Sequence, residues 1–263
     1  MRADKFFSEK FGSRTKAAEA IEKGLVLLNG KTIRPKDEVT GTENFTFPVP
    51  EEHFVSNGGY KLSRAIKTFQ YSCINKVFVD IGASTGGFSD CLLQNGAKRI
   101  YAVDVGESLL HERIAENPAI VTMENTNARY LTNEDFPEKI DAVTTDVSFI
   151  SLKLILPAIK QILSNSGEAL LLIKPQFECE KKNIGKSGIV HPSSHPKIVR
   201  GIVDFCLELG LYPVGIINAP IRKGKNIEYV VYLRSENTNC ISVLQIENSV
   251  KEFIKLNSLN ELK

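Results

Sequence analysis

The chain has 263 residues, of which 42% are hydrophobic and 24% are charged, as in an ordinary globular protein. The 33 Lys and Arg nearly balance the 31 Asp and Glu, which excludes a uniformly basic surface but leaves room for local basic patches. Five scattered Cys without a CxxC pair predict neither a disulfide framework nor a zinc site. No secretory signal and no apolar run of about 20 residues is visible, so we expect a cytoplasmic protein without stable membrane association.

The first 50 residues are predicted to form a small basic α+β domain. Residues 1–36 carry nine Lys and Arg against four Asp and Glu, whereas residues 37–52 carry five acids and no base. Asn29-Gly30 follows an apolar run and is a strong signal for a β-hairpin. Prolines and acidic residues then predict a linker at residues 51–58. The predicted helices cover residues 4–11 and 15–23, and the predicted strands cover 25–28 and 45–47.

From residue 59 onwards, strand and helix patterns alternate, which predicts a parallel, doubly wound sheet. The predicted strands cover residues 76–81, 99–104, 120–123, 142–145, 169–174, 212–217 and 229–233, and the predicted helices cover 86–94, 109–115, 152–163 and 196–209. Only a loop separates the last two strands, so we expect these to be antiparallel. The sequence therefore predicts an α/β, Rossmann-like domain over residues 59–234, followed by a tail, residues 235–263, that is predicted to be helical.

A glycine-rich turn follows the first strand of this domain. It contains neither the G-x-G-x-x-G spacing of dinucleotide folds nor a P-loop. Asp104 ends the next strand, where it can accept hydrogen bonds from ribose hydroxyls. A glycine turn without a phosphate cradle, combined with this acid, favours S-adenosylmethionine over a nucleotide di- or triphosphate, and a purely structural turn is the alternative. The predicted cofactor residues are Gly82, Ala83, Ser84, Thr85, Gly86, Gly87, Phe88, Asp104 and Val105.

Charged residues stand at the ends of the later strands. Asp146 follows the fourth strand, Lys174 closes the fifth, and Glu228 opens the last. A lysine that ends a run of apolar residues is costly to desolvate unless carboxylates surround it, so we expect Asp146 and Glu228 near Lys174. Lys61, on a basic helix before the first strand, adds a second cation. A buried ion-pair cluster without a chemical role is the alternative.

The motifs that are missing narrow the chemistry further. The fourth strand is followed by Asp-Val-Ser-Phe and not by the Asn/Asp-Pro-Pro-aromatic motif that is common in amino-methylating enzymes. No Cys lies near this loop to serve as the nucleophile of pyrimidine carbon methylation. A hydroxyl acceptor would instead need a base, and a lysine can serve when burial and a second cation lower its pKa.

These residues support a resemblance to a known family. Lys61, Asp146, Lys174 and Glu228 resemble the Lys-Asp-Lys-Glu tetrad of RNA ribose 2'-O-methyltransferases of the FtsJ/RrmJ class. The chain is similar to the TlyA ("hemolysin A") family from Arg2 to about Leu233. The segments that carry this similarity are Val55–Leu62, Asp80–Asp90, Asn125–Leu131, Asp146–Leu152 and Lys174–Glu178. The residues Arg2-Ala3-Asp4, Ser13-Arg14, Ala17, Ile21, Gly24, Val26 and Asn29-Gly30 are similar to the family's N-terminal αL RNA-binding motif.

The resemblance implies a Rossmann-like, S-adenosylmethionine-dependent methyltransferase sheet with a small N-terminal α+β RNA-binding domain. It implies 2'-O-methylation of a cytidine in ribosomal RNA, with the large-subunit RNA favoured. Separately, His191 and His195 are expected in a loop, with no other His or Cys close enough in sequence to complete a site, so we expect no metal. Lys174 would act as the base between Asp146 and Glu228, and Lys61 would help to hold the ribose. Asn127 and Ala128 join the expected cofactor residues. The expected RNA-binding residues are Arg2, Arg14, Lys16, Lys31, Arg64 and Lys67.

Two other functions remain open at this point. The family's historical name suggests a membrane-acting haemolysin, although no long basic amphipathic helix is visible. An RNA-binding ribosome assembly factor with a vestigial site is the second alternative. The basic groups Lys181-Lys182, Lys186 and Arg222-Lys223-Lys225 are interpreted as either a solvated face or phosphate contacts.

Overall fold

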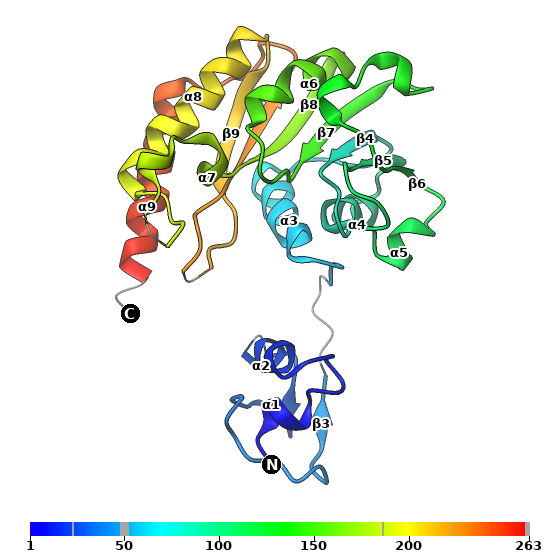
Figure 1. The fold of residues 1–263 in the computed structure, drawn as a ribbon, viewed down its shortest axis with the longest axis vertical. Coiled ribbons are helices and arrows are strands. Elements are labelled where there is room, and N and C mark those ends of the chain that lie inside the picture. The colour runs from blue at the N-terminus through cyan, green and yellow to red at the C-terminus, as the bar shows by residue number, and fades with distance from the viewer. Residues whose placement is uncertain (23, 48–52, 186, 223, 261–263) are drawn as a thin grey trace. The chain divides into compact units, whose positions relative to one another are not determined.

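The computed structural model describes residues 1–22, 24–47, 53–185, 187–222 and 224–260. The chain divides into two compact units, Met1–His53 and Phe54–Lys263 (Figure 1). The predicted linker at 51–58 needs a correction at its end, because helix α3 begins at Asn57 after the extended Ser56. Residues 51 and 52 of that linker lie outside the described residues.

The first unit joins two helices to a three-stranded antiparallel sheet of order β2-β1-β3. The elements are α1 (Ala3–Phe6), α2 (Arg14–Glu22), β1 (Leu27–Leu28), β2 (Lys31–Thr32) and β3 (Phe45–Thr46). Asn29 and Gly30 both have positive φ, 50° and 76°, as the predicted tight hairpin requires. The first helix is shorter than predicted, because Phe7 leaves the helical conformation and packs its ring edge-on against Phe45.

The second unit contains a seven-stranded sheet of order β6-β5-β4-β7-β8-β10-β9. Its strands are β4 (Val77–Ile81), β5 (Arg99–Val103), β6 (Ile120–Met123), β7 (Ile140–Thr145), β8 (Leu163–Ile173), β9 (Tyr212–Asn218) and β10 (Tyr229–Arg234). The pairs from β6 to β8 are parallel, and β10 is antiparallel to both β8 and β9. The doubly wound α/β sheet and its antiparallel last pair are therefore confirmed.

Helices cover both faces of this sheet. The α-helices are α3 (Asn57–Phe69), α4 (Gly87–Gln94), α5 (Glu112–Ala115), α6 (Leu156–Ile162), α7 (Pro175–Glu178), α8 (His195–Glu208) and α9 (Val243–Asn260). Short 3₁₀ turns are η1 (Ala128–Tyr130), η2 (Asn133–Asp135), η3 (Leu152–Leu154), η4 (Lys181–Asn183) and η5 (Pro192–Ser194). Alternate residues of each strand enter two apolar clusters, one shared with α6, α8 and α9 and the other with α3 and α4.

Several predicted elements need correction. The strand predicted over 169–174 begins at Leu163 as β8, and the helix predicted over 109–115 begins at Glu112 as α5. The helix predicted over 152–163 is divided into η3 and α6, because Pro157 stands in the first turn of α6 and cannot donate a backbone hydrogen bond to the turn before it. The tail after residue 234 is not separate from the fold: Ile246 and Val250 of α9 are fully buried, and α9 lies against α8 and β9 (Figure 1). Leu244, near the start of α9, is exposed.

Candidate active site

The predicted site residues of the second unit gather at one edge of the sheet. The parallel strands β4, β5, β7 and β8 all end there, and open α/β sheets bind their ligands beyond the carboxyl ends of such strands. A pocket of about 300 Å³ opens at this edge. Its lining residues are Ile81, Gly82, Ser84, Val103, Asp104, Val105, Leu109, Thr126, Asn127, Ala128, Asp146, Val147, Ser148, Phe149, Ile150 and Ile155.

Gly82 brings the turn after β4 close to the loop after β7. Its φ is +79°, and a Cβ atom built there would lie 3.0 Å from Val147 Cγ1 and 3.2 Å from the backbone of Asp146. A larger residue would be strained and would push these two loops apart. Ser84, two residues further on, also has a positive φ of 47°. The turn therefore has little freedom to change its course along the pocket.

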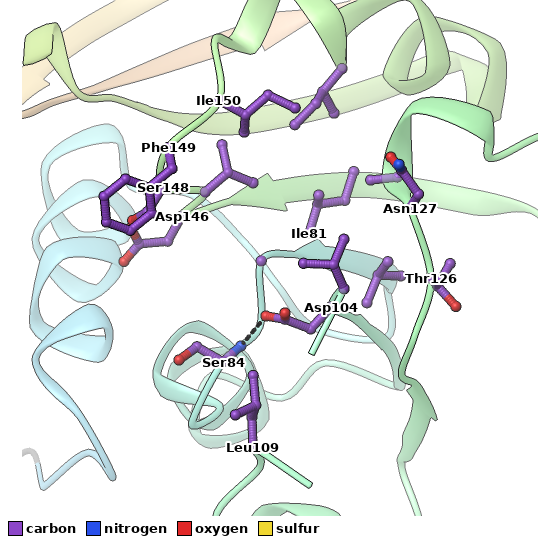
Figure 2. A pocket seen from close by; sticks show the side chains of 16 residues that line it. Ile81, Ser84, Asp104, Leu109, Thr126, Asn127, Asp146, Ser148, Phe149 and Ile150 are labelled. Carbon is purple, nitrogen blue, oxygen red and sulfur yellow. Dashed lines mark hydrogen bonds between the residues drawn. The ribbon is translucent and has the colours of Figure 1, made fainter. Parts of the chain in front are cut away.

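Asp104 joins the turn after β4 to the turn after β5. Its Oδ2 accepts a hydrogen bond from the Ser84 backbone N–H at 2.8 Å, and its Oδ1 accepts one from the Gly106 N–H at 2.9 Å (Figure 2). A carboxylate has about four lone-pair positions, so two remain for a ligand. Apolar side chains such as Val103 and Ile155 line the rest of the pocket. The free lone pairs of Asp104 and the apolar lining together fit a nucleoside whose ribose hydroxyls donate hydrogen bonds to Asp104. Such a nucleoside is expected for S-adenosylmethionine.

The structure brings most, but not all, of the predicted cofactor residues to the pocket. Six of them line it, namely Gly82, Ser84, Asp104, Val105, Asn127 and Ala128. Phe88 instead lies in the apolar cluster under α3, because the first turn of α4 directs its ring away from the pocket. The remaining four, Ala83, Thr85, Gly86 and Gly87, continue the turn into α4 and are not among the lining residues.

Several lining residues were not predicted from the sequence. Leu109, Thr126, Val147, Ser148, Phe149 and Ile150 all lie in the segments that follow β5, β6 and β7. The rule that parallel strands bind ligands beyond their carboxyl ends would have identified these segments. Phe149 is the most unusual of them, because its ring is 92% exposed and its φ is +64°. Its ring centroid lies 5.1 Å from that of Phe177.

The four charged residues form one connected cluster beside the pocket. Asp146 lies between two lysines: its Oδ1 is 2.6 Å from Lys174 Nζ, and its Oδ2 is 3.3 Å from Lys61 Nζ. Glu228 Oε2 lies 2.8 Å from Lys61 Nζ. The exposed fractions of these side chains range from 9% to 21%. Glu228 is therefore joined to Lys174 through Lys61 and Asp146, and does not flank it as the sequence suggested.

A buried carboxyl lies under this edge of the sheet. Asp80 of β4 is fully buried and accepts hydrogen bonds from Ser89 Oγ at 2.7 Å and Thr144 Oγ1 at 2.9 Å. Desolvation raises the pKa of Asp80 to about 6, although the two hydroxyl groups oppose the shift. Its hydrogen bonds connect β4 to β7 and to α4, the helix that follows the glycine-rich turn.

The expected RNA-binding residues are spread over both units. In the first unit, Arg2 and Arg14 pair with the buried Asp4 at 2.7 and 3.1 Å, and the hydrogen bond from Arg2 contributes most to lowering the pKa of Asp4 to about 2. Lys16 and Lys31 are exposed on the same unit. In the second unit, α3 carries the remaining two on its exposed side, Arg64 and Lys67.

The fold and this site define the second unit as a methyltransferase domain. Residues 54–235 match the family model of FtsJ-like methyltransferases, and residues 1–44 match that of the S4 domain. The chain belongs to the TlyA family of FtsJ-like methyltransferases, as its curated relatives show.

Three relatives illustrate the similarity. The chain is 36% identical to the 16S/23S rRNA (cytidine-2'-O)-methyltransferase TlyA of Mycobacterium tuberculosis over 92% of each chain. It is 38% identical to Hemolysin A of Brachyspira hyodysenteriae, over 88% of this chain and 99% of that one. A solved structure, a "putative hemolysin" from Streptococcus thermophilus, matches 100% of this chain and 98% of its own with a TM-score of 0.77 and 35% identity. Among the described residues, no helix has both the length and the apolar character to cross a membrane.

Proposed function

We propose that this protein transfers a methyl group from S-adenosylmethionine to the ribose 2'-hydroxyl of a cytidine in ribosomal RNA, with the large-subunit RNA as the favoured target. The main observation in support of this proposal is the position of Asp146, which lines the pocket and also pairs with Lys174. A methyl donor in the pocket would therefore lie next to a buried amine. The printed name of the M. tuberculosis relative supports the choice of cytidine and ribosomal RNA.

Residues on both sides of the pocket would hold the donor. Asp104 would accept hydrogen bonds from the donor's ribose hydroxyls, and Asn127 (Figure 2) and Ala128 would also contact the donor, since both line the pocket. Gly82 would allow the donor to approach the backbone of the turn closely. When bound, S-adenosylmethionine supplies a methyl group on a positively charged sulfur, which makes the methyl carbon electrophilic.

Lys174 would act as the general base. In its neutral form, its Nζ would take the proton of the 2'-hydroxyl, which would make the ribose oxygen nucleophilic towards the methyl group that the donor would supply. The proton then stays on Lys174 and passes to water after the product leaves. Asp146 holds Lys174 in place, and Lys61, itself held by Glu228, helps to hold the ribose.

Contacts to the RNA would come from both units. The S4 match and the exposed lysines Lys16 and Lys31 support phosphate binding by the first unit. The exposed ring of Phe149 at the pocket would stack on the base of the target nucleotide, since any base offers a π face to an aromatic side chain.

The test is methyl transfer to separated ribosomal subunits. Purified protein is incubated with labelled S-adenosylmethionine and each subunit, and the modified ribose is mapped, with Lys174→Ala as the inactive control. We expect one modified cytidine in large-subunit RNA. Absence of any ribose methylation, together with leakage of dye from liposomes, would instead support the haemolysin hypothesis.

A further inference from the structure

The side-chain amine of Lys174 has more partners than the four charged residues alone supply. Besides Asp146 Oδ1 at 2.6 Å, it donates to Ser148 Oγ at 2.8 Å and makes a long contact of 3.4 Å with the backbone oxygen of Asp146. A lysine ammonium has three N–H donors, and two of them make hydrogen bonds, to Ser148 Oγ and to the backbone oxygen, whereas Asp146 Oδ1 makes an ion pair without hydrogen-bond geometry. Two of these contacts are short and one is long.

Ser148 belongs to the pocket as well as to Lys174. It lines the pocket in the loop that follows β7, between Asp146 and the exposed Phe149 (Figure 2). Its hydroxyl therefore lies between the region assigned to the methyl donor and the amine assigned as base. A hydroxyl oxygen can accept a hydrogen bond from an ammonium and equally from an N–H of a neutral amine.

We propose that Ser148 is a positioning residue that fixes the rotation of the Lys174 amine. This inference rests on the proposed function. The two hydrogen bonds, to Ser148 Oγ and to the backbone oxygen of Asp146, hold the two N–H groups that a neutral amine retains. The third position around Nζ carries no hydrogen bond among the described residues, and it is then left for the lone pair that receives the 2'-hydroxyl proton. Without Ser148, the lone pair would point in this direction only part of the time.

The test compares Ser148→Ala, Ser148→Thr and Ser151→Ala. Ser151 is a matched control, since it lies in the same loop but donates its hydroxyl hydrogen bond to Glu178 at 2.6 Å. We expect Ser148→Ala to lower kcat roughly 10- to 100-fold, with unchanged S-adenosylmethionine affinity and RNA KM, because only orientation is lost. The acid limb of its pH–rate profile should move to lower pH, since the ammonium form loses an acceptor.

The other two variants complete this experiment. Ser148→Thr keeps the hydroxyl and should recover most of the kcat and the original pH profile. Ser151→Ala should keep the acid limb of the wild-type profile. A Ser148→Ala enzyme with wild-type kcat and pH profile would overturn the proposal. So would a Ser151→Ala enzyme that changes both in the same way, because the effect would then belong to the loop as a whole.

A second measurement does not depend on the RNA substrate. Competitive acylation with acetic anhydride, quantified by peptide mass spectrometry, reports how reactive the Lys174 amine is. We expect several-fold faster labelling of Lys174 in Ser148→Ala than in wild type or Ser151→Ala. Equal labelling in all three would overturn the role of Ser148. Failure of the wild-type protein to methylate ribosomal RNA would overturn the proposed function and leave this result standing.

Discussion

Two lysine–carboxylate clusters lie at opposite ends of the same sheet. At the carboxyl end, Lys174 and Asp146 lie beside the pocket. At the other end, Lys76 pairs with Glu168, which also accepts a hydrogen bond from the Tyr232 hydroxyl. Desolvation would raise the pKa of Glu168, but the hydrogen bonds from Lys76 and Tyr232 lower it overall.

The surroundings of the two clusters differ more than their charges do. The Lys76 ammonium lies 4.2 Å from the ring centroid of Tyr71, and aromatic side chains surround this cluster. The Lys174 cluster adjoins a pocket and the exposed ring of Phe149. A partly buried ion pair is therefore not by itself a sign of catalysis. The adjoining pocket is what distinguishes the candidate site from a structural pair.

Replacing Lys174 should have the largest effect. Lys174→Ala should lower turnover by roughly 10²- to 10⁴-fold, the usual contribution of a general base, while S-adenosylmethionine still binds. Lys174→Arg should not restore activity, because a guanidinium stays protonated. Single-turnover methyl transfer and calorimetry of donor binding check both statements. Rapid transfer by Lys174→Arg would leave Lys174 as a positioning cation only.

Asp80 extends the comparison to a carboxyl group without a cationic hydrogen-bond partner. Asp80 accepts hydrogen bonds from two hydroxyl groups, whereas Glu168 pairs with a lysine. Its pKa of about 6, against the usual 3.8, means that the folded state binds more protons in this window. Stability should therefore fall as pH rises from about 4 to about 6, by up to about 3 kcal/mol. Urea unfolding of wild type and Asp80→Asn across this range isolates the contribution. If the free energies of unfolding of the two proteins changed in parallel with pH, this role of Asp80 would be contradicted.

Asp104 tests the donor side of the pocket. Asp104→Ala should weaken S-adenosylmethionine binding, because the ribose hydroxyls would lose a charged acceptor worth about 1.5–3 kcal/mol. The variant should also loosen the turn after β4, which Asp104 holds through the Ser84 backbone. Calorimetry measures the affinity, and Asp104→Asn serves as the uncharged isostere. Unchanged affinity in Asp104→Ala would remove Asp104 from the donor site.

The smallest expected effect is that of Lys76 at the other end of the sheet. Lys76→Met should lower the free energy of unfolding by about 1–2 kcal/mol, since Glu168 loses a charge-assisted hydrogen bond at a partly exposed position. Methyl transfer should stay at the wild-type rate. Denaturant unfolding and the activity assay are run on the same preparation. A large loss of activity in a folded Lys76→Met protein would show that the two clusters are coupled.

Much of the fold could be predicted from local sequence. The strand at 120–123 has the predicted bounds, and the Asn29-Gly30 hairpin forms because only residues that tolerate positive φ fit its turn. The burial of Ile246 could not be predicted, because it depends on contacts of α9 with elements far away in the sequence. Local pattern shows that a helix is amphipathic but not which surface covers it.

Some residues of the candidate site could likewise be predicted from the sequence, and others could not. The four charged residues could be chosen because each stands at a strand end or on an adjoining helix, where burial would need a partner. Phe88 was assigned to the pocket because it continues the glycine-rich turn, but the turn of α4 directs it into the core. The link between Ser148 and Lys174 could not be predicted, since it depends on the rotamers of two side chains that follow the neighbouring strands β7 and β8.

The close approach at Gly82 has a consequence for anyone who wants to redesign this enzyme. A Cβ atom at Gly82 would lie only 3.2 Å from the backbone of Asp146, so a side chain there would need the loop after β7 to move. A change that widens the pocket for a bulkier sulfonium analogue would therefore also displace the acceptor side. Mutations in these two loops should show non-additive effects, so libraries for altered donor use have to vary both loops together.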